Sequence, residues 1–249
     1  MIEKDPLVRW ALAAHDARAW RRPGAVVVAC PDLSHWDRLV MNGEPDALAS
    51  LLREVLPVVG GNFRPFGAEQ LVTDVVARMP ELEVSARFAW METTTPVTPH
   101  LPVGLERGSS AMAPSGLTPM PAGGPEWLTG DAWPEINALL EESFPDSYAK
   151  PGAPGVRRWA GVRGADGRLL AVAAEAWSTD EIGFLAGVTT HPDARGRGVA
   201  AALCAFAADE QLTGRERVAL IVDYWNEAAI ATYRKLGFTT RPVAAARQR

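Results

Sequence analysis

The feature that most constrains this chain is an apolar segment that passes through a proline and two glycines into an alanine-rich segment. Residues 182–190 read Ile-Gly-Phe-Leu-Ala-Gly-Val-Thr-Thr, which is typical of a buried strand. The turn at His191-Pro-Asp and the basic loop Arg195-Gly-Arg-Gly198 follow, and residues 196–212 have the composition of a helix. The sequence therefore predicts a strand, a glycine loop and a helix N-terminus in immediate succession.

A glycine loop that opens a helix after a strand is suited to binding an anion. The first N–H groups of a helix have no partner within it, and the helix dipole adds about half a positive charge there. Gly196 and Gly198 let a ligand approach the backbone, while Arg195 and Arg197 add positive charge. The loop predicts a phosphate or pyrophosphate site. A basic surface loop whose glycines only serve the turn is the alternative.

Composition excludes several classes of protein. The 249 residues carry a net charge of −5, so a broad nucleic-acid-binding surface is not expected. No apolar run approaches the roughly 20 residues that cross a bilayer, and the charged N-terminus lacks the apolar part of a signal peptide. The four histidines show no metal-ligand spacing, and the two cysteines lie in apolar contexts. We expect a cytoplasmic protein that binds no metal, no nucleic acid and no membrane.

A segment rich in proline and glycine divides the chain. Residues 93–125 contain seven prolines and five glycines, with too few large apolar side chains for a core. We interpret this segment as a linker between an N-terminal domain, residues 1–92, and a C-terminal domain, residues 126–249.

Apolar periodicity predicts an α/β pattern on both sides of the linker. In the N-terminal part it predicts helices at residues 6–20, 46–56 and 68–78 and strands at residues 25–30 and 86–92. In the C-terminal part it predicts a helix capped by Asp131, strands at residues 156–162, 169–177, 182–190, 218–222 and 238–243, and helices at residues 196–212 and 226–235. This order mixes hairpins with one crossover, so we expect a mixed, mostly antiparallel twisted sheet flanked by helices.

Two separate stretches of the C-terminal part resemble the GNAT N-acetyltransferase superfamily. Arg195-x-x-Gly198-x-Ala200 is similar to the family's Gln/Arg-x-x-Gly-x-Gly/Ala turn, and Asn226 to Phe238 is similar to its Asn-x-x-Ala-x-x-x-Tyr-x-x-x-Gly-Phe ending. The clear resemblance covers residues 175–240, and a weaker one covers residues 126–175. The N-terminal part lacks both motifs. It is either a degenerate GNAT-like repeat or a distinct α/β domain for substrate recognition.

The resemblance implies acetyl-CoA, or another acyl-CoA, as the donor substrate. The loop and the first helical turn would hold the pyrophosphate, the strand before them would pair with the pantetheine arm through its backbone, and Asn226 would bind the same arm. The donor-binding residues implied in this way are Val188, Thr189, Thr190, Arg195, Gly196, Arg197, Gly198, Val199, Ala200, Ala201 and Asn226.

The resemblance also implies that an amine attacks the thioester directly. An N–H group at or near Val188 would stabilise the oxyanion. Tyr233 stands where the family has a proton donor to the departing thiolate, although a packed aromatic is the alternative. For the general base we favour Glu175 over Asp223, because a carboxylate within an apolar run must face a cleft or a cation. A carboxylate on a solvated face and a chain of waters remain open.

These features together predict an N-acetyltransferase that acetylates a primary amine of a small molecule or amino acid. A protein or peptide N-acetyltransferase and a CoA-binding sensor without activity are the alternatives. Trp90, Trp133, Tyr148 and Trp177 are candidates for lining the acceptor cleft. The sequence leaves the acceptor and the oligomeric state open, and a homodimer is compatible with it.

Overall fold

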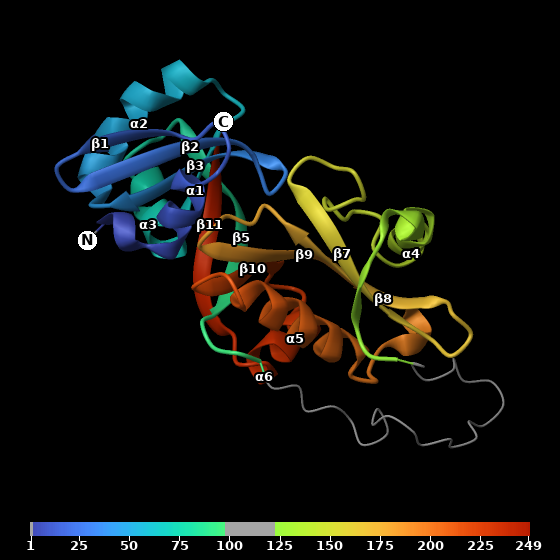
Figure 1. Cartoon of the computed structure of the whole chain (residues 1–249). Helices are drawn as coiled ribbons and strands as arrows, with labels where there is room; N and C mark the ends of the chain where they lie inside the picture. The colour runs from blue at the N-terminus through green and yellow to red at the C-terminus, as the bar shows by residue number, and fades with distance from the viewer. Residues whose placement is uncertain (1, 98–122) are drawn as a thin grey trace.

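The computed structural model describes residues 2–97 and 123–249, and its centre is one twisted sheet (Figure 1). Among these residues eleven strands lie in the order β1-β2-β3-β4-β11-β5-β10-β9-β8-β7-β6. Neighbouring strands are antiparallel except β3 with β4 and β9 with β10, which are parallel. The predicted fold, a mixed and mostly antiparallel twisted sheet flanked by helices, is confirmed.

The N-terminal part supplies five strands and three helices of the described chain. In chain order they are α1 (Pro6–Leu12), β1 (Arg18–Arg22), β2 (Ala25–Leu33), β3 (Trp36–Gly43), α2 (Pro45–Val59), β4 (Arg64–Ala68), α3 (Glu69–Val76) and β5 (Leu82–Thr93).

The C-terminal part supplies the remaining strands and helices. They are β6 (Glu126–Leu128), α4 (Trp133–Ser143), β7 (Val156–Arg163), β8 (Leu169–Ala176), β9 (Ile182–Thr190), α5 (Val199–Leu212), β10 (Arg217–Asp223), α6 (Glu227–Lys235) and β11 (Thr239–Gln248).

The two parts repeat one succession of elements. In each, three antiparallel strands lead to a helix, a strand parallel to the third, a second helix and a long final strand. The long strands are exchanged, because β5 pairs with β10 and β11, and β11 pairs with β4 and β5. One sheet thus runs across the predicted division at residues 92 and 126. Most of the predicted linker, residues 98–122, lies outside the described residues, and the domain boundaries stay a prediction.

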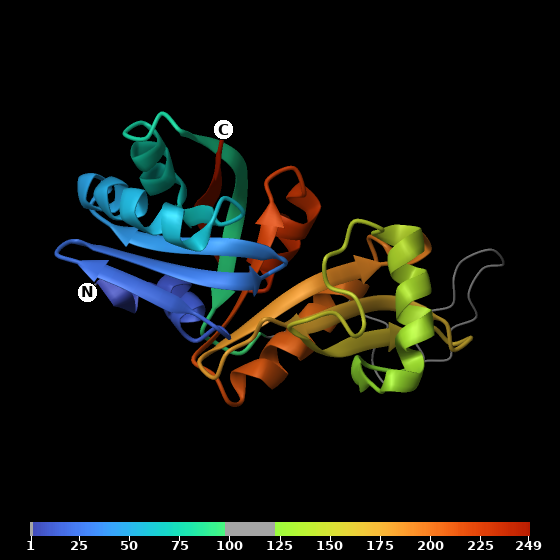
Figure 2. The same ribbon diagram turned by 90° about the horizontal axis from the view of Figure 1, so that it is seen from above.

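Helices cover both faces of the sheet. The side chains of α2, α3, α5 and α6 pack on one face, and those of α1 and α4 pack on the other. Figure 2 shows α4 lying across the strands that are coloured yellow to orange, far from α2 and α3. Trp10 of α1 anchors the second face: its ring stacks on Phe184 of β9 at 4.7 Å, and its indole N–H donates to the Trp177 carbonyl at 2.8 Å.

The structure corrects three details of the predicted elements. The helix predicted over residues 6–20 ends at Leu12, and Asp16 takes a φ of 56° before the chain turns into β1. Both β3 and β4 were missed, because their polar and charged residues interrupt the apolar pattern. Asp131 does not cap α4: a short 3₁₀ turn at Gly130–Ala132 precedes the helix, and Asp131 accepts a hydrogen bond from Thr129 instead.

Candidate functional site

The parallel strands β9 and β10 begin as neighbours and then part. Their pairing runs from Ile182 with Arg217 to Phe184 with Ala219 and stops there. Yet β9 continues to Thr190 and β10 to Asp223. Among the described residues no strand pairs with residues 185–190 on the β10 side, so their backbone groups can pair with an extended ligand.

A bulge in β9 lies within the opening. Thr189 pairs with Val172 and Ala186 pairs with Ala174, so Gly187 and Val188 together face one residue of β8. Gly187 has a φ of +59°, and a Cβ at this position would lie 2.9 Å from the Trp159 ring and 3.1 Å from the Cβ of Ala149. Glycine is therefore needed for both conformation and space. The bulge interrupts the regular hydrogen bonding of β9 with β8 at Val188, the residue whose N–H is predicted to stabilise the oxyanion.

The loop after β9 leaves the N-terminus of α5 open. Gly196 and Gly198 have φ values of 71° and 78°, which favour glycine, and a Cβ on Gly196 would meet nothing within 4 Å. Gly198 precedes the helix and no side chain caps it. The first N–H groups of α5, which belong to residues 199–201, are thus available for an anion at the positive end of the helix dipole.

Buried contacts fix this loop between β9 and α4. Nδ1 of the buried His191 accepts the Asp193 N–H at 3.2 Å, and its Nε2 lies 3.1 Å from Glu142 of α4. Arg195 donates through Nε to the Thr190 carbonyl at 3.1 Å. Arg195 therefore holds the loop in shape as well as adding charge at its mouth.

Tyr233 and Val188 lie on the same face of the sheet, the one covered by α5 and α6. Tyr233 is 6% exposed and belongs to the apolar cluster against which Val188 packs. Its hydroxyl shares a hydrogen bond with the Cys204 thiol of α5, and burial raises the pKa of Tyr233 well above its usual value. Burial also raises the pKa of Cys204 to about 12, so neither group ionises near neutral pH. Tyr233 is thus kept in its donor form.

Asn226 lies at the opposite lip of the opening, directly after β10. Its side-chain oxygen accepts the Ala229 N–H at 3.2 Å and caps α6. This cap leaves the side-chain amide NH₂ for another partner. The structure therefore brings the predicted loop, β9, Asn226 and Tyr233 around one opening.

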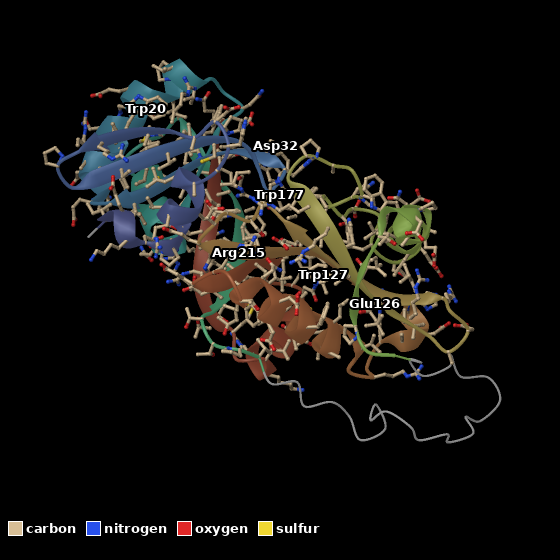
Figure 3. The ribbon with its side chains drawn as sticks, viewed as in Figure 1. Trp20, Asp32, Glu126, Trp127, Trp177 and Arg215 are labelled. Atoms are coloured by element: carbon tan, nitrogen blue, oxygen red, sulfur yellow. The ribbon has the colours of Figure 1, made fainter. Side chains whose placement is uncertain are left out.

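Glu175 lies apart from that arrangement and is neutralised by arginines. The side chain is 3% exposed, and its two oxygens accept from Arg158 Nε at 2.7 Å and from Arg215 Nη2 at 2.7 Å. Arg215, labelled in Figure 3, comes from the turn before β10. These pairs tie β7 and β8 to that turn and favour a structural role. The assignment of Glu175 as the base stays a prediction.

Asp223 is the carboxylate that the geometry favours as a base. It ends β10, opposite Phe88 of β5, and no ion pair of the described residues includes it. Burial raises the pKa of Asp223 above its usual value. Because Val222 packs under α5 and α6, Asp223 points to the other face of the sheet. The opening thus has a candidate acid on one face and a candidate base on the other.

Residues 127–238 match the family model described as "Acetyltransferase (GNAT) family". These residues belong to the GNAT acetyltransferase family. They include the glycine loop, both strands of the opening, Asn226 and Tyr233. No curated protein matches the chain in sequence.

Solved structures with the same fold cover nearly the whole chain. A GCN5-related N-acetyltransferase from Kribbella flavida is 16% identical, with a TM-score of 0.62 over 97% of this chain and 92% of that one. A putative GNAT acetyltransferase from Novosphingobium aromaticivorans is 21% identical, with a TM-score of 0.55 over 99% and 98%. A GCN5-related N-acetyltransferase from Sphaerobacter thermophilus is 15% identical, with a TM-score of 0.56 over 90% and 80%. At these identities the likeness shows the fold.

The N-terminal part has no counterpart to the GNAT loop. Its strand β3 ends at Gly43 and α2 begins at Pro45, with Glu44 at the N-cap and Asp46 in the first turn. Proline has no N–H to offer, and two carboxylates already occupy the positive end of the helix. The start of α2 therefore does not suit a pyrophosphate.

Among residues 2–97 and 123–249, none of the helices combines the length and apolar character that a membrane crossing needs. Nor do residues 2–97 and 123–249 contain a group of three or more His, Cys, Asp or Glu side chains placed to hold a metal ion.

Of the aromatic residues predicted to line an acceptor cleft, Tyr148 is the one that the structure places at an exposed junction. Trp90 is buried beside Trp10, with ring centroids 5.4 Å apart, and Trp177 packs on Phe184. Trp133 lies on α4 and a Cβ on Gly152 would touch it. Tyr148 is 52% exposed and stacks on His35 of the N-terminal part at 4.4 Å. Sequence periodicity missed this contact because it joins residues of two distant loops.

We predict that Gly198→Trp abolishes acetyl-CoA binding. The indole would block the approach to the first turn of α5. The backbone at position 198 has a positive φ, which is strained for any L side chain. Calorimetry should show an affinity at least about 100-fold weaker, which is roughly 2.7 kcal/mol. Gly214→Trp, at the other end of α5 where a Cβ has open space, is the control and should bind normally. An unchanged affinity of Gly198→Trp would refute the loop as the phosphate site.

We predict that Glu175→Gln weakens folding rather than the chemical step. It removes the negative charge between two arginines at a buried position, which should cost roughly 1–3 kcal/mol of unfolding free energy. Urea unfolding measures this loss, and Glu141→Gln on the exposed side of α4 should stay within about 0.5 kcal/mol of the wild type. A large loss of kcat with unchanged stability would instead make Glu175 the base.

Proposed function

We propose that the protein transfers the acetyl group of acetyl-CoA to a primary amine of a small molecule or amino acid by direct attack. The observation that carries this proposal is the parting of β9 and β10 directly before an uncapped, glycine-lined helix N-terminus. An extended pantetheine arm fits the first feature and a pyrophosphate fits the second. The GNAT membership of residues 127–238 supports the same donor.

The donor would be held mainly by backbone groups. The N–H groups of residues 199–201 bind the pyrophosphate, and the free edge of β9 from residue 185 to 190 pairs with the pantetheine arm. Asn226 donates to the arm from the other side of the opening. This arrangement would bring the thioester to the bulge at Gly187 and Val188, between Tyr233 on one face of the sheet and Asp223 on the other.

The chemical step divides between the two faces. The neutral amine nitrogen attacks the thioester carbon, and a backbone N–H at the bulge stabilises the oxyanion. Asp223 takes the proton that the attacking nitrogen must lose. The carbon–sulfur bond then breaks, and Tyr233 hydrogen-bonds to the thiolate. Because burial raises the pKa of Tyr233, this hydrogen bond is favoured over complete proton transfer, and the thiolate is protonated from solvent.

A small acceptor suits the second face better than a peptide does. On this face α1 fills one end of the concave surface through Trp10. The other end is bridged where His35 of the β2–β3 turn stacks on Tyr148. A long peptide would have to displace one of these contacts.

Thioester consumption tests the function directly. We expect calorimetry to detect acetyl-CoA binding, and thiol release to rise with at least one primary amine from a panel of amino acids, polyamines and amino sugars. Binding without turnover of any amine would identify a CoA-binding module instead. The absence of binding at millimolar acetyl-CoA would refute the donor.

We predict that Tyr233→Phe lowers kcat about 100-fold while the KM for acetyl-CoA changes less than about twofold. The variant keeps the packing of the ring and loses the donor to the thiolate, together with the hydrogen bond that the hydroxyl shares with the Cys204 thiol. Steady-state kinetics at saturating acetyl-CoA measures the effect. The control is Tyr224→Phe, whose hydroxyl donates to Glu69 away from the opening and whose loss should leave kcat unchanged. Equal kcat values for Tyr233→Phe and wild type would assign Tyr233 to packing alone.

We predict that Asp223→Asn lowers kcat/KM about 100-fold at neutral pH and removes one limb of the pH profile. The base acts when deprotonated, so activity rises as pH increases through its pKa, and burial places this limb above the usual aspartate range. A weakly basic amine, neutral across the tested range, keeps the acceptor's own ionisation out of the profile. The exposed Asp180→Asn is the control. A profile that Asp223→Asn does not alter would exclude Asp223 as the base.

A further inference from the structure

Strand β3 buries an arginine that has no carboxylate partner. Arg38 is 4% exposed, and its guanidinium lies 4.4 Å from the centre of the Phe66 ring. Its Nε donates to the Leu33 carbonyl at 2.8 Å. Within residues 2–97 and 123–249, no Asp or Glu forms an ion pair with it, and Tyr148 and Cys30 are the groups that favour its charged form.

A second cation makes the position of this arginine still less favourable. Arg64 of β4 is the direct neighbour of Arg38 in the β3–β4 ladder, and it too has no ion pair among the described residues. Burial and the charge of Arg64 lower the pKa of Arg38 to about 10, so Arg38 stays charged at neutral pH. A buried charge without a counterion is unfavourable. The buried Arg38 beside the half-buried Arg64 therefore indicates a place where an anion can bind.

A series of contacts links these arginines to the bulge in β9. The Arg64 guanidinium is 3.5 Å from the centre of the Trp36 ring, and that ring is 6.0 Å from Tyr148. Tyr148 adjoins Ala149, which packs against the bulge in β9, since a Cβ on Gly187 would lie 3.1 Å from it. A chain of contacts thus joins Arg64 to the predicted position of the thioester.

The arrangement of the sheet explains this proximity. The exchange of β5 and β11 places β3 and β9 in opposite directions, so β3 begins at the end of the sheet where β9 finishes. Val40 and Phe66 pack with α1 on the second face, and by alternation Arg38 and Arg64 share that face with Asp223. An open hollow of about 700 Å³ lies beside the ring pair of His35 and Tyr148, and Lys150 and Asp146 also line it.

We propose that Arg38 and Arg64 bind the carboxylate of the amine acceptor, so that the substrate is an amino acid or another small amine that carries a carboxylate. This inference rests on the proposed acetyl transfer. Guanidinium groups present paired donors that match the two oxygens of a carboxylate. The rings of Trp36 and Tyr148 then flank the body of the acceptor, and its amine points toward the bulge and Asp223. The anion at these arginines is not the pyrophosphate of the donor, because the proposed pyrophosphate site is the start of α5, which packs on the other face of the sheet.

Matched acceptors test this assignment. Wild-type kcat/KM is compared for the twenty standard amino acids and their carboxamides, and for phosphoethanolamine and ethanolamine. We expect at least one amino acid to exceed its carboxamide by about 100-fold or more, because a site built for a polar group rejects an analogue that lacks it. Arg38→Met should raise the acceptor KM and reduce this ratio to near one. The KM for acetyl-CoA and the rate with the carboxamide should change less than about twofold.

Stability separates binding from a structural role. Arg38→Met removes a charge without a counterion and keeps an apolar side chain over Phe66, so its melting temperature should equal or exceed that of the wild type. The exposed Arg18→Met is the control for the loss of one positive charge. A lower melting temperature with an unchanged acid-to-amide ratio would make Arg38 a structural residue and overturn the proposal.

The outcomes distinguish this inference from the proposed function. Turnover of acids and carboxamides at equal rates, or a preference for phosphoethanolamine, would overturn the carboxylate assignment and leave acetyl transfer intact. If no amine is acetylated, acetyl transfer fails, and calorimetry of the same amino acids against the CoA-loaded protein tests the arginines alone. Binding that Arg38→Met abolishes would still support a carboxylate site, whereas no binding of any amino acid would overturn it.

Discussion

The two long strands β5 and β11 pair with each other, and each also pairs with a strand from the opposite part of the chain. This exchange commits both ends of the sequence to one sheet. It fixes β3 and β9 in opposite directions, so β3 begins at the end of the sheet where β9 finishes. The N-terminal part, which has no glycine loop of its own, thereby places residues at the same end of the sheet as the proposed reaction centre. Its position follows from strand pairing rather than from a separate docking interface.

The two parts use the same pair of parallel strands differently. Arg217 opens β10 as Arg64 opens β4, and each pairs with the strand parallel to it. Glu92 neutralises Arg217 at 2.8 Å, whereas none of the ion pairs in the described ranges includes Arg64. Conversely, the open helix N-terminus of α5 has its counterpart in the acidic start of α2. In the C-terminal part the positive end is thus the start of α5, whereas in the N-terminal part the positive charge lies on the strands β3 and β4.

The sequence was most informative where local chemistry decides the structure. The strand at Ile182–Thr190 has the predicted bounds, and Gly237 ends α6 with a φ of 85° as a helix stop should. The helix after the loop begins at Val199, later than predicted, because the positive φ of Gly196 and Gly198 cannot continue into a helix. These features depend on a few consecutive residues, and the GNAT motifs lie among them.

The sequence was least informative where distant residues decide the role of a side chain. Glu175 in its apolar run is compatible with a catalytic base until Arg215, 40 positions away, is found on its carboxylate. Asp223 has an equally apolar strand before it, and none of the ion pairs among residues 2–97 and 123–249 includes it. The two carboxylates have similar local sequences, and only the arginines that the fold places beside Glu175 distinguish their roles. Arg38 is the opposite case, a buried cation. No Asp or Glu of the described residues neutralises it, so its charge is available to an anionic ligand.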